Sequence, residues 1–120
     1  MRVLFDHNVP HKLRTSLVSL SKHEIITASY LGWGDLPNGE LLRRAEQDGF
    51  EVFVTGDQRL IYEQHLIGRR VAVIALSTNN WPLIKDHVPT ILAAIDTVAP
   101  GSAQVVECGT FTRKGRRRMQ

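Results

Sequence analysis

Two aspartates stand directly after apolar segments of the chain, in positions where a carboxylate can do chemistry. Asp6 follows the apolar residues 3–5, and Asp57 follows residues 51–55 after one glycine, Gly56. Two carboxylates held close together repel each other, so such a pair favours a shared proton or a divalent cation. Mg²⁺ and Mn²⁺ prefer oxygen ligands and commonly bind one or two carboxylates together with water. A cation held there could activate water against a phosphodiester.

Polar residues near these acids are further candidates, although each also has a structural explanation. Asn8 carries an amide oxygen that a cation accepts, but Asn8 and Asn38 both stand where asparagine commonly caps a helix. Aspartate after a strand also often caps a turn. Ser77 follows a fourth apolar segment. The five histidines show no metal-binding spacing, which favours surface or interface positions for them.

Apolar periodicity predicts strands that alternate with helices, which is typical of an α/β fold. The expected architecture has three layers, with a mostly parallel sheet of four or five strands and helices on both faces. In open sheets of this class, ligands bind outside the carboxyl ends of the strands. The predicted strands cover residues 3–5, 24–27, 51–55, 71–76 and 103–107; the predicted helices start near Asn8 and Pro10, run from Asn38 to Gly49, and cover 58–66 and 81–98.

The charge of the chain is unevenly distributed. Its 120 residues include 15 Lys+Arg and 12 Asp+Glu, for a formal net charge of +3. Five of the positive charges follow Thr112, so residues 1–112 carry 10 positive and 12 negative charges. We predict one domain over residues 1–111 and a basic C-terminal tail over 112–120. The tail could hold RNA through phosphate contacts, or it is a solubilising or added end.

The composition excludes several classes of protein. With 42% hydrophobic and 22% charged residues, the chain has the composition of a folded globular protein. Its one cysteine, Cys108, cannot form an internal disulfide, and a zinc site of the usual kind needs more thiols. No apolar run approaches the length of a membrane span, and the first residues do not resemble a signal peptide. We therefore expect a cytoplasmic protein with no membrane partner.

Three motifs occur in a recognisable order. Asp-x-Asn-x-Pro covers residues 6–10, a glycine-rich loop leads into a short helix over 32–42, and Thr-x-Asp covers 55–57. In their order and spacing, over residues 1–108, they resemble the PIN-like nuclease domains, in particular a bacterial branch of small uncharacterised proteins. Further residues that match this branch are Ala45, Gln58, Leu60, Tyr62, Gln64, Leu66, Gly68, Arg69, Arg70, Leu76, Ser77, Thr78, Trp81 and Pro82.

The resemblance implies a metal-dependent ribonuclease, since active PIN-like nucleases use three or four acids around one or two divalent ions. The first acid corresponds to Asp6, and the acid after the third strand corresponds to Asp57. This chain departs from the pattern at Asn38 and Arg59, where many relatives have aspartate. Glu40 and Asp35 are nearby carboxylates that could substitute, although a carboxylate in the first turn of a helix, such as Glu40, is also stabilised by the helix dipole.

The first hypothesis is therefore a ribonuclease that uses Mg²⁺ or Mn²⁺, as the toxin of a toxin–antitoxin pair with an antitoxin protein as partner. Asp6 and Asp57 would hold the cation, with Asn8, Asn38 or Glu40 completing the shell. Homodimers are common among PIN-like proteins, and the apolar helix over 81–98 is a candidate dimer surface. The residues expected to contact RNA are Arg59, Arg43, Lys12, Thr55 and Ser77.

Two alternatives stay open at this point. The loss of a carboxylate at Asn38, together with a cationic Arg59 near the expected metal, favours a module that has lost hydrolysis and still binds RNA or a protein. Receiver domains that accept a phosphoryl group also carry acids after the first and third strands and a Ser or Thr after the fourth. However, His7 stands where a receiver has a second acid, and residues 105–109 contain no lysine.

Overall fold

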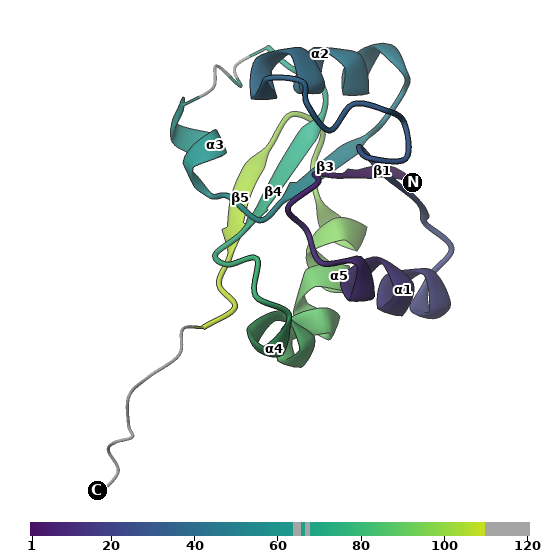
Figure 1. The fold of residues 1–120 in the computed structure, drawn as a ribbon, viewed down its shortest axis with the longest axis vertical. Helices are drawn as coiled ribbons and strands as arrows, with labels where there is room; N and C mark the ends of the chain where they lie inside the picture. Colours follow the sequence, from purple (N-terminus) through teal and green to yellow (C-terminus); the bar gives the residue numbers. More distant parts are fainter. Residues whose placement is uncertain (64–65, 67, 110–120) are drawn as a thin grey trace, which may run out of the picture.

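A five-stranded parallel sheet forms the centre of the structure, a computed structural model that describes residues 1–63, 66 and 68–109 (Figure 1). Each strand begins and ends within one residue of its predicted bounds, so the prediction of an α/β fold is confirmed, with five strands. All four neighbouring pairs are parallel. The strands are β1 (Arg2–Phe5), β2 (Glu24–Thr27), β3 (Val52–Thr55), β4 (Ala72–Leu76) and β5 (Ala103–Val106), in the order β2-β1-β3-β4-β5.

Helices lie on both faces of this sheet. Successive residues of a strand point to opposite faces, so neighbours in one strand pack against different helices. In β1, Leu4 packs in a buried cluster with residues of α2 and α3, whereas Phe5 packs in a second cluster with residues of α1 and α5. Figure 1 shows the same two layers, one on each side of the sheet. The helices are α1 (His11–Leu20), α2 (Asn38–Gln47), α3 (Arg59–Glu63), α4 (Trp81–Ile84), the 3₁₀ helix η1 (Lys85–His87) and α5 (Val88–Thr97).

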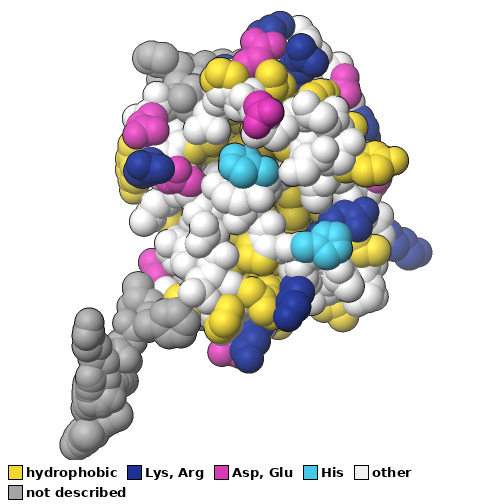
Figure 2. Space-filling model, in the orientation of Figure 1, with side chains coloured by type: hydrophobic (Ala, Val, Ile, Leu, Met, Phe, Trp, Pro, Cys, Tyr) yellow, Lys and Arg dark blue, Asp and Glu magenta, His cyan; other side chains and the backbone are white. Residues whose placement is uncertain are grey.

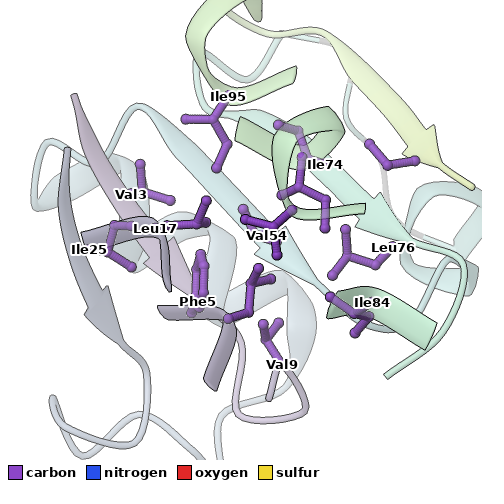
Figure 3. Close-up of a cluster of buried hydrophobic side chains, with 14 of the residues drawn as sticks. Val3, Phe5, Val9, Leu17, Ile25, Val54, Ile74, Leu76, Ile84 and Ile95 are labelled. Carbon is purple, nitrogen blue, oxygen red and sulfur yellow. The ribbon is translucent and has the colours of Figure 1, made fainter. Parts of the chain in front are cut away.

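The cluster on the side of α1 and α5 is the larger of the two, and Val54 lies in its middle (Figure 3). Leu17 from α1 and Ile95 from α5 both belong to it, and neither has any exposed surface. All residues of β3 and β4 are buried, as expected for central strands of a parallel sheet covered on both faces. This packing holds the strand ends in place and so positions the residues that follow them.

The predicted helix over 81–98 is wrong as a single element. It is divided into α4, η1 and α5, with the 3₁₀ segment over Lys85–His87 between the two α-helices. Pro89 explains the break, because proline has no N–H and its ring clashes with the carbonyl four residues earlier, that of Lys85. The apolar stripe on this segment, which includes Ile84 and Ile91, is buried within the chain. The stripe is therefore used in packing within the fold, and a dimer surface on this segment stays a prediction.

The two predicted asparagine caps are also wrong. Pro10 precedes α1 and Pro37 precedes α2, and neither helix has a side-chain hydrogen bond at its cap. Asn38 is instead the first helical residue of α2, and the Asn8 side chain is used elsewhere. Gly49 does end α2 as predicted, since its φ of 80° is readily adopted only by glycine.

Some predictions fall outside the described residues. Residues 64 and 65 of the predicted helix over 58–66 belong to this group, as do the expected domain boundary at residue 111 and the basic tail over 112–120. Within the described part of the chain, no helix has the length and apolar character needed to cross a membrane.

The packing predicts a large effect of truncating Phe53, which has no exposed surface and lies in the cluster with α2 and α3. We expect Phe53→Ala to lower the free energy of unfolding by about 3–5 kcal/mol, through lost burial and the cavity left behind. Urea denaturation measures it. Val18→Ala, at a position that is 44% exposed, is the control and should change stability by about 0.5 kcal/mol or less. Equal effects of the two variants would contradict the packing.

Candidate functional site

The strand order places Asp6 and Asp57 at the topological switch point of the sheet. From β1 the chain passes to β2 on one side, and β3 then lies on the other side of β1. In open α/β sheets the crevice outside the carboxyl ends of two such strands is where ligands bind, and the order 2-1-3-4-5 follows the same rule. Asp6 follows β1 directly, and Asp57 comes two residues after the end of β3. The structure therefore places both acids at the edge of the sheet where the sequence predicts them, and their role as a site stays a prediction.

Asp6 is a buried carboxylate, with only 3% of its surface exposed. A charged group in such a place is tolerated only when it is well hydrogen-bonded. One of its oxygens, Oδ1, accepts the His7 backbone N–H at 2.8 Å and lies 2.9 Å from Nδ1 of the His7 ring. The other oxygen, Oδ2, accepts the Thr55 hydroxyl at 2.9 Å. Protein donors thus contact both oxygens and fix the orientation of the carboxylate.

Thr55 connects the segments that carry the two acids. Its hydroxyl donates to Asp6 and also accepts the backbone N–H of Asp57, at 3.2 Å. Thr55 is the last residue of β3 and has no exposed surface. The side chain that the sequence placed among the RNA contacts therefore holds the two acid segments together from inside the protein.

Asp57 is held by Arg59, two residues further along the chain. The arginine Nε lies 2.9 Å from Oδ1 and 3.2 Å from Oδ2, and Nη2 lies 2.7 Å from Oδ2. The backbone N–H of Arg59 also donates to Oδ1, at 3.0 Å. Hydrogen bonds from the Arg59 side chain lower the pKa of Asp57 and raise that of Arg59. The Asp57 carboxylate is therefore charged, and Arg59 bonds both of its oxygens. The Arg59 side chain itself is 73% exposed.

Three loops meet at Gly56. Its backbone N–H donates to the Asn8 side-chain oxygen at 2.8 Å, which ties the loop after β1 to the loop after β3. A Cβ atom on Gly56 would lie 3.0 Å from Cβ of Asn79, in the loop after β4, and 3.3 Å from both the backbone and the side-chain oxygen of Asn8. Asn8 is thus neither a helix cap nor a free metal ligand in this arrangement, because its amide oxygen positions the β3 loop.

Glu40 is paired with arginines of its own helix. It forms ion pairs with Arg43 and Arg44 on the same helix, and the hydrogen bond from Arg43 is the main cause of its lowered pKa. Among the residues that the structure describes, no three His, Cys, Asp or Glu side chains are grouped so that they could hold a metal ion. Glu40 therefore does not complete a three-acid shell with Asp6 and Asp57.

The remaining predicted residues have different surroundings. Lys12 is exposed in the first turn of α1, and Arg43 is exposed in α2. The Ser77 hydroxyl accepts the backbone N–H of Cys108 at 2.9 Å, so it joins the ends of β4 and β5. Burial raises the pKa of the Cys108 thiol, which makes it a poor nucleophile at neutral pH.

Sequence reasoning missed several residues of this region. His7 contacts Asp6 through both its backbone and its ring, and its position next to the acid was the available signal. Trp33 lies edge-on against Phe50, with ring centroids 6.3 Å apart. Among the described residues, the largely exposed aromatic side chains are Tyr30, at 82%, and Tyr62, at 76%. No periodic pattern distinguishes an exposed tyrosine from a buried one.

Mg²⁺ commonly takes one or two carboxylates and completes its shell with water and substrate oxygens. The two carboxylates at this edge are those of Asp6 and Asp57, and protein donors contact the oxygens of both. Two hollows elsewhere, of about 320 and 600 Å³, include neither acid in their lining.

Comparison with known proteins adds no relative: no family model, no curated protein and no solved structure matches this chain. Function is therefore inferred from the chemistry of the site's own residues.

The crowding at Gly56 predicts that even one methyl group there is destabilising. We expect Gly56→Ala to lower the free energy of unfolding by about 1–3 kcal/mol, since the loops around it must separate. Urea denaturation is the measurement. Gly34→Ala is the matched control, because its nearest neighbour would be Ser29 Oγ at 3.7 Å, an ordinary contact. A Gly56→Ala protein as stable as the control would contradict the packing described.

The ion pair of Asp57 predicts a pH dependence of stability. Since Arg59 lowers the pKa of Asp57 in the folded protein, the pair stabilises the fold above the pKa of an unfolded aspartate, about 3.9. This contribution is lost as the pH falls through the lower folded pKa. The stability difference between wild type and Asp57→Asn should therefore shrink below about pH 4 in urea titrations. Asp86→Asn, at an exposed acid on η1, is the control; a constant Asp57→Asn difference would contradict the pairing.

Proposed function

We propose that the edge formed by the ends of β1 and β3 is the site of a metal-dependent ribonuclease of PIN-like type. The observation that carries this proposal is the Thr55 hydroxyl, which bonds the Asp6 carboxylate and the Asp57 backbone N–H at once. Two acids at a topological switch point are a suitable site for a divalent cation and a phosphodiester. The motifs of the PIN-like resemblance fall on the same residues.

Each residue of the candidate site has a distinct part in this proposal. Asp6 and Asp57 would hold Mg²⁺ or Mn²⁺, which lowers the pKa of a water molecule and balances charge on the phosphodiester oxygens. His7 and Thr55 keep the Asp6 carboxylate oriented. Arg59 offers a guanidinium to a phosphate of the RNA. The reaction adds water across one P–O bond of the RNA and leaves a phosphate monoester and a free hydroxyl.

A second candidate function is a module of the same fold that binds RNA or a protein without hydrolysis. The observation that favours it is the bidentate Arg59–Asp57 pair, which places a cation where a metal would bind. Calorimetry with Mn²⁺ separates the two candidates: absence of binding at millimolar metal favours the module, and binding that depends on both acids favours the nuclease.

Other parts of the functional hypothesis stay predictions. An antitoxin partner, a homodimer, a cytoplasmic location and an RNA-binding role for the basic tail rest on the sequence. Figure 2 shows that Lys and Arg side chains on one face of the protein are interspersed with Asp and Glu. In this proposal, affinity for RNA comes from individual cations placed near the two acids, such as Arg59 and Lys12.

The nuclease proposal predicts that Asp6→Asn reduces Mn²⁺-dependent cleavage of a labelled single-stranded RNA by at least about 100-fold, because one carboxylate of the metal site is neutralised. The amide keeps the shape of the side chain and can still accept the Thr55 hydroxyl. Gel analysis of cleavage products measures the rate, and circular dichroism verifies the fold.

Asp86→Asn is the matched control, since Asp86 is exposed on η1, and it should cleave at the wild-type rate. If Asp6→Asn cleaves the RNA as fast as this control, the assignment of Asp6 is wrong.

A further inference from the structure

Arg59 and Tyr62 occupy one exposed face of α3, immediately after the candidate site. They are three residues apart, so their side chains are neighbours on the helix surface. Leu60, which is 1% exposed, anchors the opposite side of the helix among the core residues. Arg59 and Tyr62 are 73% and 76% exposed. This face therefore combines a cation and an aromatic ring on a fixed support, with open solvent in front of both.

The bond between Arg59 and Asp57 is of a kind that a phosphate can replace. A guanidinium presents its N–H groups as a fork that fits a carboxylate or a phosphate equally well. Because the Arg59 side chain is largely exposed, a phosphate can reach it without disturbing packed residues. Figure 2 shows basic and acidic side chains next to each other over α3. Release of the Arg59 side chain would leave Oδ2 of Asp57 available to a cation, while Oδ1 still accepts the Arg59 backbone N–H.

Tyr62 supplies what a phosphate site alone lacks, a flat apolar surface. Exposed aromatic side chains in proteins that bind single-stranded nucleic acid stack on bases without regard to their sequence. Tyr62 stands beside the cation that would hold the adjoining phosphate.

We propose that Arg59 and Tyr62 form a binding face for a nucleotide of single-stranded RNA, on which phosphate takes Arg59 from Asp57 and the base stacks on Tyr62. Arg59 thereby keeps Asp57 closed to cations until RNA arrives, so RNA and metal strengthen each other's binding. This inference rests on the proposed function, because RNA is taken as the ligand. The negative charge of Glu63 raises the pKa of Arg59, and the same charge repels a phosphate that approaches Arg59.

RNA binding can be measured without catalysis by fluorescence anisotropy of a labelled 12-nucleotide single-stranded RNA in EDTA. We expect Arg59→Gln and Tyr62→Ala each to weaken binding at least about five-fold, as loss of one stacked base would. Tyr62→Phe should bind as wild type. The matched controls are Tyr30→Ala, at an equally exposed tyrosine, and Lys22→Gln, an exposed lysine before β2, and neither should change the affinity by more than about two-fold.

The exchange of partners at Asp57 is tested by calorimetry with Mn²⁺. Arg59→Gln should bind Mn²⁺ at least about five-fold more tightly than wild type, because Asp57 is already free. An RNA whose bridging P–O bonds are replaced by P–C bonds, which water does not cleave, should strengthen Mn²⁺ binding to wild type, and this coupling should disappear in Arg59→Gln. Equal Mn²⁺ affinities of the two proteins would overturn the exchange.

The outcomes separate this inference from the ribonuclease proposal. If the α3 variants bind RNA like the controls while Asp6→Asn still abolishes Mn²⁺-dependent cleavage, the binding face is wrong and the nuclease site stands. If the α3 variants lose RNA but wild type neither binds Mn²⁺ nor cleaves, the nuclease and the exchange are wrong, and the face belongs to a binding module.

Discussion

The burial of the Asp6 carboxylate is the constraint on which the rest of the site depends. A charged group that is 3% exposed must be hydrogen-bonded, and its requirement for donors places His7 and Thr55. Thr55 can serve only because β3 lies beside β1 in register, with Phe5 opposite Val54. The same hydroxyl then positions Asp57, and Arg59 follows from the turn that Asp57 begins. One buried charge thus organises the edge of two strands.

Most of the fold was accessible from the sequence, for a physical reason. Parallel strands covered on both faces must be apolar throughout, so β3 and β4 appear as continuous apolar runs with sharp ends. Helix boundaries were less accessible, because they depend on single residues. Pro89 interrupts an apolar stripe that otherwise has an uninterrupted helical period. Asn38 has the side chain of a cap, yet the helix begins there after Pro37.

The location of the site could also be predicted, whereas the partners of its residues could not. Strand order brings Asp6 and Asp57 to one edge, and spacing alone shows that both follow strands. Which donor satisfies which oxygen depends on side-chain directions: Asn8 bonds Gly56, Glu40 turns to Arg43, and Thr55 points inward. For this reason spacing suggests three acids, whereas the structure brings two of them, Asp6 and Asp57, to this edge, bonded by Thr55 and Arg59 respectively.

We propose that Asp6 and Asp57 hold one divalent cation together. The most direct test is a crystal soaked in Mn²⁺ with a cleavage-resistant RNA, with anomalous scattering recorded to locate the metal. If they do, we expect a manganese peak within about 2.5 Å of a carboxylate oxygen of each aspartate, with Arg59 turned away from Asp57. Arg59 still bonded to Asp57, with no manganese at either acid, would contradict this proposal.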